Sequence, residues 1–223
     1  MTKLYKFTKL EHFKSLKQKG EIRIGTLHNF RKDEHGAMVS DSMEGKIILN
    51  GSVNFATAES VKNNPILKTA IGIEEGTAIN GLLVENHTIV QSDCFVYCTA
   101  IEFTNLIHEQ WYKARKYNVC YEIRFPTIFF RRISDELAKI IPVNHVWRDE
   151  VIYHNARKGI DPFTYTGHYQ EIPYFALKDQ VDFENQREFR SVWRPIIGAR
   201  MLDPIDLTIP ALSEHVKIHN LIK

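Results

Sequence analysis

Short stretches of this 223-residue chain alternate between apolar and polar side chains, and this pattern most strongly restricts the fold. The longest is DFENQREFRSVWRP, residues 182–195. Its aromatic residues occupy odd positions, namely Phe183, Phe189 and Trp193. Four polar residues occupy even positions, namely Glu184, Gln186, Glu188 and Arg190. Because successive side chains of a strand point to opposite faces, residues 182–195 are predicted to form a strand with one buried and one polar face.

Other segments alternate in the same way and predict further strands. They are LYKFT at 4–8, EIRIGTL at 21–27, CFVYCTA at 94–100 and VCYEIRF at 119–125, with weaker candidates at 146–153 and 216–222. In the segment 94–100 the alternation places Tyr97 and Thr99 on one face. The chain is therefore expected to be rich in β-structure.

The first strand is followed by a predicted helix. The residues T-K-L-E, Thr8 to Glu11, have the spacing of a capping box in which Thr8 caps the helix and Glu11 reaches back. Apolar residues follow at helical spacing, and Gly20 stands where a left-handed C-terminal cap belongs. The first 27 residues are thus predicted to fold as strand, helix, strand.

Two Asn-Gly pairs predict tight hairpins. Asn50-Gly51 lies between the strand candidates Lys46–Leu49 and Ser52–Phe55, and Asn80-Gly81 has a similar setting. Asn-Gly favours the type I′ turn, which matches the twist of the flanking strands. We therefore expect the chain to reverse at both pairs.

Helices are expected in the second half as well. Residues Asn105 to Lys116 form one candidate, and Ser134 is predicted to cap a short helix, Asp135 to Ile141, which Pro142 ends. Strands and helices do not alternate regularly, and no internal repeat or linker divides the chain. The prediction is one α+β domain spanning residues 1–223, with a few short helices.

Composition points to an ordinary globular protein of the cytoplasm. The chain is 43% hydrophobic and 25% charged, with a net charge of +2. No apolar run approaches the ~20 residues that span a bilayer, and charges interrupt every apolar stretch near the N-terminus, so neither a membrane segment nor a secretory signal is expected. The three cysteines form no disulfide-framework spacing, which favours a reducing compartment.

The sequence predicts no metal site and contains no familiar nucleotide-binding or nucleophile motif. Cys94 and Cys98 would be separated by ~13 Å along a strand, which is too far to share a zinc ion. HExxH and paired CxxC motifs, a Walker A loop and GxGxxG are all missing. Any chemistry must therefore come from polar residues on the faces of strands.

Several segments carry a resemblance to known proteins. LYKFTKLEHFKSLKQKGEIRIGTL resembles the opening of ADP-ribosyltransferase-like proteins, particularly the DNA-modifying toxins, in which the first strand carries His-x-Thr. The matching residues here are Lys6-Phe7-Thr8, so a lysine replaces the family's histidine. The segments FRKDE, CFVYCTA, QWYKARKY and FALKDQVDFENQREFRSVW are similar to a broad group of bacterial proteins of unknown function.

The resemblance is sharpest at Gln186-Arg187-Glu188. Many ADP-ribosyltransferases carry [Q/E]-x-E on a late strand, which implies that Glu188 is catalytic and that Gln186 positions the acceptor. Breaking the nicotinamide–ribose bond of NAD develops positive charge on the ribose, and a nearby carboxylate stabilises it. On an alternating strand Gln186 and Glu188 would lie on one face, ~6.6 Å apart.

The resemblance also implies an ADP-ribosyltransferase-like fold, with a bent or split, mainly antiparallel sheet and a cleft shared by Leu4–Thr8 and Glu188. NAD would be the substrate, and no metal would be needed. Further residues are expected to contact NAD: Lys6 and Thr8 at the adenosine or pyrophosphate side, Tyr97 and Thr99 at the nicotinamide, and Arg31 at a phosphate. Arg190 is expected either to contact a ligand phosphate or to form an exposed or cleft ion pair with Glu188. The acceptor would be a nucleic acid or a protein, and the role that of a bacterial toxin or phage-defence effector.

The main alternative is a binding module without catalysis. Cations and aromatic residues are interleaved in a way that suits stacked bases of a nucleic acid, or a protein partner. These residues are Lys9, Lys14 and Lys17, with Trp111, Tyr112, Lys113, Arg115 and Lys116. A nuclease is the third possibility, but the sequence shows no carboxylate cluster of the metal-binding type.

Overall fold

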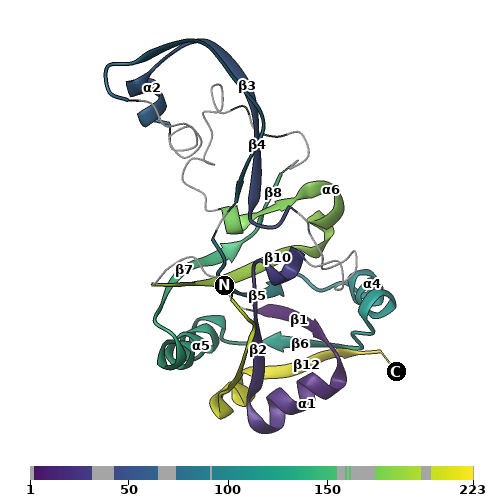
Figure 1. Cartoon of the computed structure of the whole chain (residues 1–223). Coiled ribbons are helices and arrows are strands. Elements are labelled where there is room, and N and C mark those ends of the chain that lie inside the picture. Colours follow the sequence, from purple (N-terminus) through teal and green to yellow (C-terminus); the bar gives the residue numbers. More distant parts are fainter. Residues whose placement is uncertain are drawn as a thin grey trace.

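A computed structural model describes residues 3–31, 43–64, 74–90, 92–154, 159, 161, 174–196 and 202–222. The fold is α+β, with mainly antiparallel sheets and a few short helices, as the sequence predicts (Figure 1). The strands are β1 (Leu4–Thr8), β2 (Glu21–Thr26), β3 (Lys46–Thr57), β4 (Ala78–Val90), β5 (Phe95–Ala100), β6 (Val119–Ile123), β7 (Val143–Glu150), β8 (Ile152–His154), β9 (Leu177–Asp179), β10 (Glu188–Pro195), β11 (Ile205–Thr208) and β12 (Val216–Leu221). The α-helices are α1 (Leu10–Lys19), α2 (Ala58–Lys62), α4 (Asn105–Arg115), α5 (Pro126–Ile140) and α6 (Gln180–Phe183), and the short 3-10 helices are η1 (Asn29–Arg31), η5 (Tyr174–Ala176), η6 (Glu184–Gln186) and η7 (Pro210–His215).

The main sheet divides at β5. Its strands run in the order β11-β2-β5-β1-β6-β12, and β10 pairs with β5 and with β7. One edge of β5 pairs with β10 from Phe95 to Ala100. The other edge is shared: β2 pairs with Phe95 and Val96, whereas β1 pairs only through Tyr5 with Ala100. The strands β1 and β2 therefore part along this edge, and the sheet branches at β5.

The core lies on one face of this sheet. Phe13 of α1 packs against Tyr121 of β6, and Phe130 of α5 packs against the aromatic residues of β5 and β10. Trp193 is fully buried there, and its indole Nε1 donates to Ser134 Oγ over 2.7 Å. Phe189 and Trp193 thus share the buried face that alternation along this segment predicts.

Two predicted helix starts are wrong. The N-cap of α1 is Lys9, without a side-chain cap bond, and the Leu10 N–H instead donates to Asn118 Oδ1 over 2.9 Å. A distant side chain therefore replaces the predicted capping box. Likewise, α5 begins at Pro126, whose fixed φ suits a first helical position, and Ser134 lies within the helix with its hydroxyl bonded to the Phe130 carbonyl. Gly20 does end α1 in the left-handed region, at φ 76°.

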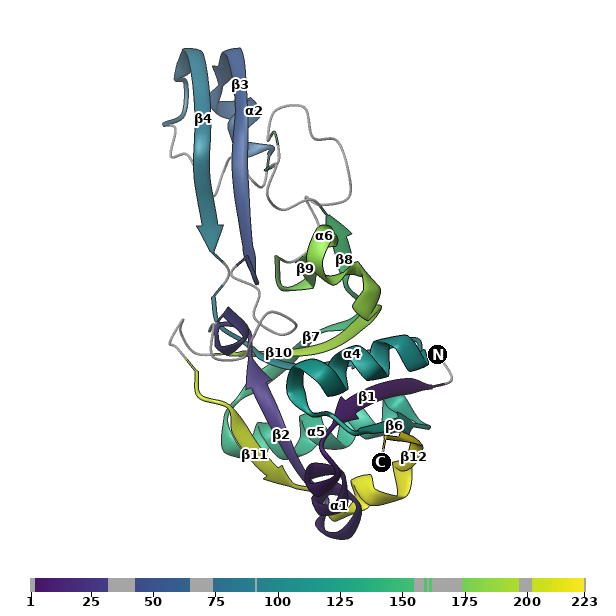
Figure 2. The same ribbon diagram turned by 90° about the vertical axis from the view of Figure 1, so that its right-hand side faces the viewer.

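Neither Asn-Gly pair forms a hairpin turn. β3 runs through Asn50-Gly51, β4 runs through Asn80-Gly81, and the two strands pair with each other along their lengths. The register shifts between Leu49 and Gly51, where Asn50 Oδ1 accepts from the Asn86 N–H over 2.6 Å. Between the partners of Leu49 and Gly51, β4 has one residue more than β3, so Asn50 lies opposite a β-bulge in β4. The ribbon β3–β4, with α2 at its outer end, is called the arm, and it projects from the main sheet (Figures 1 and 2).

The late alternating segment is a strand only in its second part. Residues 180–186 form α6 and η6, because the Asp179 side chain accepts from the Val181 N–H and starts a helical turn. Arg187 then adopts a left-handed conformation at φ 45°, and β10 begins at Glu188. The prediction of one strand over 182–195 is wrong for its first six residues.

None of the described helices is long and apolar enough to cross a bilayer. The cysteines Cys94, Cys98 and Cys120 are free thiols, and the first and last are buried.

Candidate functional site

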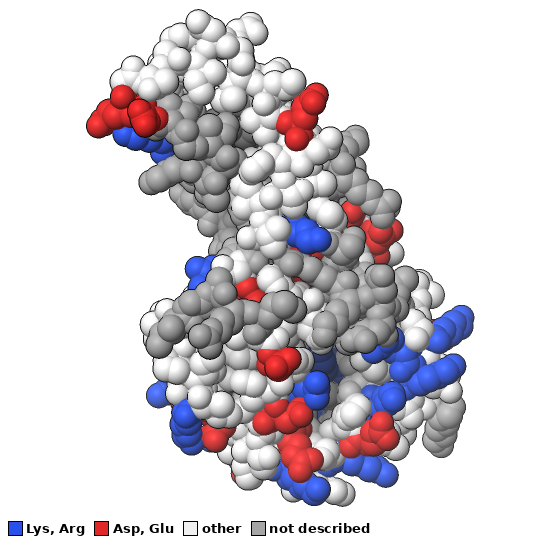
Figure 3. Space-filling view, viewed as in Figure 1, with Lys and Arg blue, Asp and Glu red and all other residues white. Residues whose placement is uncertain are grey.

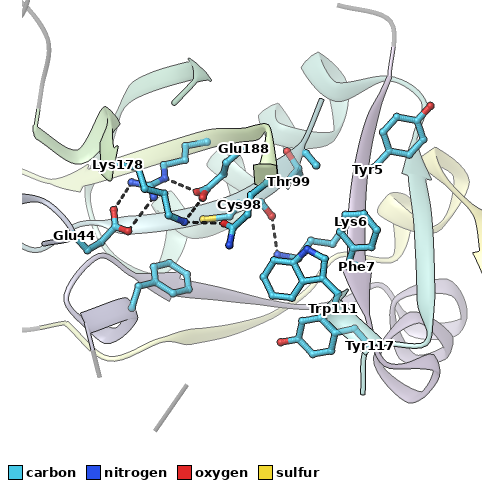
Figure 4. Close-up of a pocket in the computed structure, with 14 residues that line it drawn as sticks. Tyr5, Lys6, Phe7, Glu44, Cys98, Thr99, Trp111, Tyr117, Lys178 and Glu188 are labelled. Carbon is cyan, nitrogen blue, oxygen red and sulfur yellow. Dashed lines mark hydrogen bonds and ion pairs between the residues drawn. The ribbon is translucent and has the colours of Figure 1, made fainter. Parts of the chain in front are cut away.

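A cavity of about 120 Å³ opens where β1 and β5 part. Its charged end contains Glu44, Lys178, Gln186, Glu188 and Arg190, and its aromatic end contains Tyr5, Phe7, Trp111 and Tyr117. Figure 4 shows these two ends on opposite sides of Cys98 and Thr99. An apolar cavity of about 150 Å³ holds a benzene ring, so the enclosed volume here suits one ring-sized part of a larger ligand.

Lys6 lies at the gap between the two strands. β1 and β5 share a single residue pair, and the Lys6 ammonium crosses the gap to donate to the Cys98 carbonyl over 2.7 Å. The Lys6 Nζ is also 4.8 Å from the ring centroid of Tyr97. An ammonium carries three protons, so Lys6 has donors left for a ligand in the cavity.

Four buried charged side chains form a chain of ion pairs, called here the charge network: Glu44, Arg190, Glu188 and Lys178. Arg190 Nε lies 2.5 Å from Glu188 Oε1, and Lys178 Nζ lies 2.6 Å from Glu188 Oε2. Arg190 also pairs with both carboxylate oxygens of Glu44, with Nη2 at 3.0 Å from Oε2, and donates to the Phe175 carbonyl over 2.7 Å. All four side chains are at most 5% exposed, so water screens these pairs little.

The two acids of the network have opposite pKa shifts. Burial alone would raise the pKa of Glu188, but the charges of Arg190 and Lys178 outweigh burial and hold that pKa well below its usual range. Burial raises the pKa of Glu44, and the pairing with Arg190 offsets this only in part. Glu188 is therefore the acid that stays ionised over the whole physiological pH range.

Lys178 brings together the two residues of the Q-x-E motif. Its ammonium donates to Gln186 Oε1 over 3.0 Å as well as to Glu188. The sequence predicts this neighbourhood from strand alternation, but Gln186 ends a 3-10 helix and reaches the site through the turn at Arg187. The two side chains are neighbours because one buried cation binds both.

Lys6, Thr99, Gln186, Glu188 and Arg190 line the cavity. The prediction that Leu4–Thr8 and Glu188 open into one cleft is therefore confirmed by Lys6 and its neighbours on β1.

The other predicted residues lie elsewhere. Tyr97 belongs to the core, where its hydroxyl is 2.6 Å from that of Tyr121 and burial raises its pKa. Thr8 pairs with Val119 at the far end of β1 and is not among the described residues that line the cavity. The side chain of Arg31 lies outside the described part of the structure. Tyr97 contacts the site only indirectly, through Lys6.

Sequence reasoning missed Glu44 and the role of Lys178. Lys178 lies in FALKD, within the segment that is similar to the bacterial group, and this similarity could have marked Lys178 as a site residue. Glu44 lies 146 residues before Arg190, in the turn 43–45 that leads into β3, and no local pattern marks it.

The aromatic end is built from nearly parallel rings. Trp111 and Tyr117 have centroids 5.5 Å apart at an interplanar angle of 15°, and Phe7 lies 6.1 Å from Trp111 at 16°. These rings come from β1, from α4 and from the loop after α4. Planar apolar walls of this kind favour a planar ring of a ligand.

The comparisons with known proteins give no further guide. No family model, curated protein or solved structure matches the chain. Among the described residues, no group of three or more His, Cys, Asp or Glu side chains could hold a metal ion. The cavity itself must therefore indicate the function.

Proposed function

We propose that the cavity binds NAD and that the protein is an ADP-ribosyltransferase-like enzyme, acting as a bacterial toxin or phage-defence effector. The observation that carries this proposal is that Lys6 of the first strand and Glu188 of a late strand line one cavity at the split of the sheet. Gln186 of the Q-x-E motif lies beside Glu188 on the same buried cation.

Glu188 would act on the nicotinamide-bearing ribose. A carboxylate offers about four acceptor positions, so Glu188 has capacity for a ribose hydroxyl beside its bonds to Arg190 and Lys178. Its low pKa keeps it ionised, as stabilisation of positive charge on the ribose requires. Gln186 would then face the acceptor.

Lys6 would bind the pyrophosphate. Three cations and two acids are found among the described lining residues, which leaves one positive charge for an anionic ligand. Lys178 and Arg190 are engaged with carboxylates, whereas Lys6 donates to a backbone carbonyl. The aromatic end beside Lys6 would hold one of the two rings of NAD.

The test is the variant Glu188→Gln, which removes one charge with little change in shape. We expect label transfer from NAD to macromolecules in a cell lysate to fall by on the order of 10²–10³, together with any toxicity on expression, while the variant keeps its fold and its affinity for NAD. Glu184→Gln is the matched control, because Glu184 is exposed and close in sequence. Full activity in folded Glu188→Gln would reject Glu188 as the catalyst.

A second candidate, nucleic-acid or partner binding without catalysis, is favoured by one surface. Lys and Arg side chains gather on the right of Figure 3, where α4 lies in Figure 1. The end of α4 carries Lys113 and Arg115, and Lys116 lies 5.4 Å from the ring centroid of Tyr112. Binding of single-stranded nucleic acid with steep salt dependence, and no consumption of NAD, would favour this candidate over the enzyme.

A further inference from the structure

The charge network joins the root of the arm to the cavity. Glu44 belongs to the turn 43–45 directly before β3, Lys178 to β9, and Glu188 and Arg190 to β10. These segments are far apart in the sequence, yet the four side chains are at most 5% exposed and contact one another in order. Figure 4 shows Glu44, Lys178 and Glu188 on one side of the cavity, with dashed lines marking the ion pairs and hydrogen bonds among the residues drawn.

We propose that Lys178 and Glu44 are positioning residues for Glu188, Lys178 by direct contact and Glu44 through Arg190. The inference rests on the proposed function, in which Glu188 is the acting carboxylate. It adds that the site is complete only when the root of the arm and β9 are both in place.

The geometry gives the two residues different tasks. Lys178 binds Glu188 Oε2 and Gln186 Oε1 and so fixes the distance between the two residues of the motif. Glu44 accepts from both terminal nitrogens of Arg190 and leaves only Nε for Glu188. Without the charge of Glu44, Arg190 could turn its terminal nitrogens to Glu188 and draw the carboxylate away from the cavity.

The two tasks predict opposite effects on the ionisation of Glu188. The groups that face it are Arg190 on its own strand, Lys178 on β9, Cys98 on β5, Tyr153 on β8 and Glu44 through Arg190. Loss of the Lys178 charge raises the pKa of Glu188. Loss of the Glu44 charge removes a nearby negative charge and lowers it. The two shifts show that both charges act on Glu188 in the folded protein, and kcat then shows whether its position in the site changes.

The experiment measures NAD turnover from pH 5 to 9 for wild type, Lys178→Met, Lys178→Arg and Glu44→Gln. In Lys178→Met we expect kcat to fall on the order of 10²-fold with little change in KM, and activity to be lost on acidification at a higher pH than in wild type. Lys178→Arg should restore much of kcat and the wild-type pH profile. In Glu44→Gln kcat should fall without any such loss on the acid side.

Two exposed residues of the arm serve as controls. Lys62 and Glu75 form an ion pair with side chains 48% and 92% exposed, so Lys62→Met and Glu75→Gln change the same charges away from the site. Both should behave like wild type. A folded Lys178→Met or Glu44→Gln enzyme with the wild-type kcat and pH profile would overturn the inference.

A second measurement separates this inference from the proposed function. Carboxyl ¹³C NMR of the full chain labelled in glutamate, with the Glu188 signal assigned by its loss in Glu188→Gln, reports the ionisation of Glu188 without any substrate. In one outcome the wild type does not consume NAD, the Glu188 signal titrates at a higher pH in Lys178→Met, and Lys178→Arg restores the wild-type titration. The proposed function then fails and the positioning role stands. If the titration is the same in wild type, Lys178→Met and Glu44→Gln, the positioning role fails whatever NAD does. Should Lys178→Met not fold, Lys178→Gln, which removes the charge but keeps a hydrogen-bond donor for Glu188, replaces it in the titration.

Discussion

Arg190 and Trp193 lie three residues apart on β10, and both side chains are fully buried for different reasons. Trp193 fills the aromatic core and bonds to Ser134, as its parity with Phe189 predicts. Arg190 was expected in an exposed or cleft ion pair, but it is 1% exposed and bound to Glu188 and Glu44. The correction follows from Glu44, which supplies the second carboxylate that burial of a guanidinium requires.

This burial changes the expected effect of Arg190→Ala. Removing the guanidinium takes away the cation that two buried carboxylates, Glu44 and Glu188, share, so the free energy of unfolding should fall by about 3–5 kcal/mol. Arg23→Ala is the matched control, because Arg23 pairs with Asp206 on the surface with side chains 64% and 72% exposed. The control should change stability by less than about 0.5 kcal/mol. Urea unfolding of both variants is the measurement, and equal midpoints would contradict the buried network.

At the scale of elements, the turn and cap signals in the sequence predicted the structure only where no distant segment supplied other hydrogen-bond partners. Gly20 ends α1 as predicted because the local left-handed conformation suits glycine. The Asn-Gly pairs do not form hairpin turns, because each lies within a long strand and the two strands, β3 and β4, pair with each other. The capping box at Thr8 was replaced because Asn118 reaches the first helical N–H.

Gly20 allows a sharp test at this scale. A Cβ at Gly20 would lie 2.1 Å from the Ile209 carbonyl oxygen, a backbone atom that cannot move alone, whereas a Cβ at Gly81 would meet nothing within 4 Å. Both glycines have positive φ, at 76° and 72°. Gly81→Ala should therefore cost only the left-handed strain of roughly 1–2 kcal/mol.

Gly20→Ala should cost more, roughly 3 kcal/mol or above, because η7 must also move away from α1. The free energies of unfolding of both variants in denaturant are the quantities to compare. Similar losses would mean that the contact between Gly20 and Ile209 adjusts without cost.

At the scale of the whole molecule, the described structure has a branched main sheet, an arm and the short parallel pair β8–β9. β5 is hydrogen-bonded on both edges and lies in the core, whereas the described part of the arm is a ribbon of two strands. Phe55 and Leu83 are exposed, and the described part of the outer arm has a small apolar cluster around Ala56 and Val61. A two-stranded ribbon is marginally stable without further packing.

Amide hydrogen exchange should reflect this division. We expect peptides of β3 and β4 to exchange faster than peptides of β5 and β10, because the arm can open without disrupting the main sheet. The measurement is exchange followed by mass spectrometry on the full chain. Equal protection of the arm and of β5 would show that the arm unfolds only together with the core.

The sequence by itself determined the parts that depend on neighbouring residues. The unit β1–α1–β2, the strands β5 and β6, and the buried parity of Phe189 and Trp193 follow from alternation, helical spacing and one glycine cap. Lys6, Gln186 and Glu188 were also chosen from sequence as members of one site, and the cavity contains all three. The elements follow from local patterns, whereas the three site residues were chosen through the resemblance to ADP-ribosyltransferase-like proteins.

Only the tertiary structure decided how the buried charges are compensated. Glu44 and Arg190 are 146 residues apart, and Lys178 joins Gln186 to Glu188 from a different strand. A buried charge needs a partner close in space, and that partner can come from any part of the chain. The pairing of β3 with β4 also depends on a distant segment. A long strand pair satisfies more backbone N–H and C=O groups than a short hairpin at Asn50-Gly51 would. Local patterns specify which face of an element is buried, and the packing of distant segments specifies what it meets there.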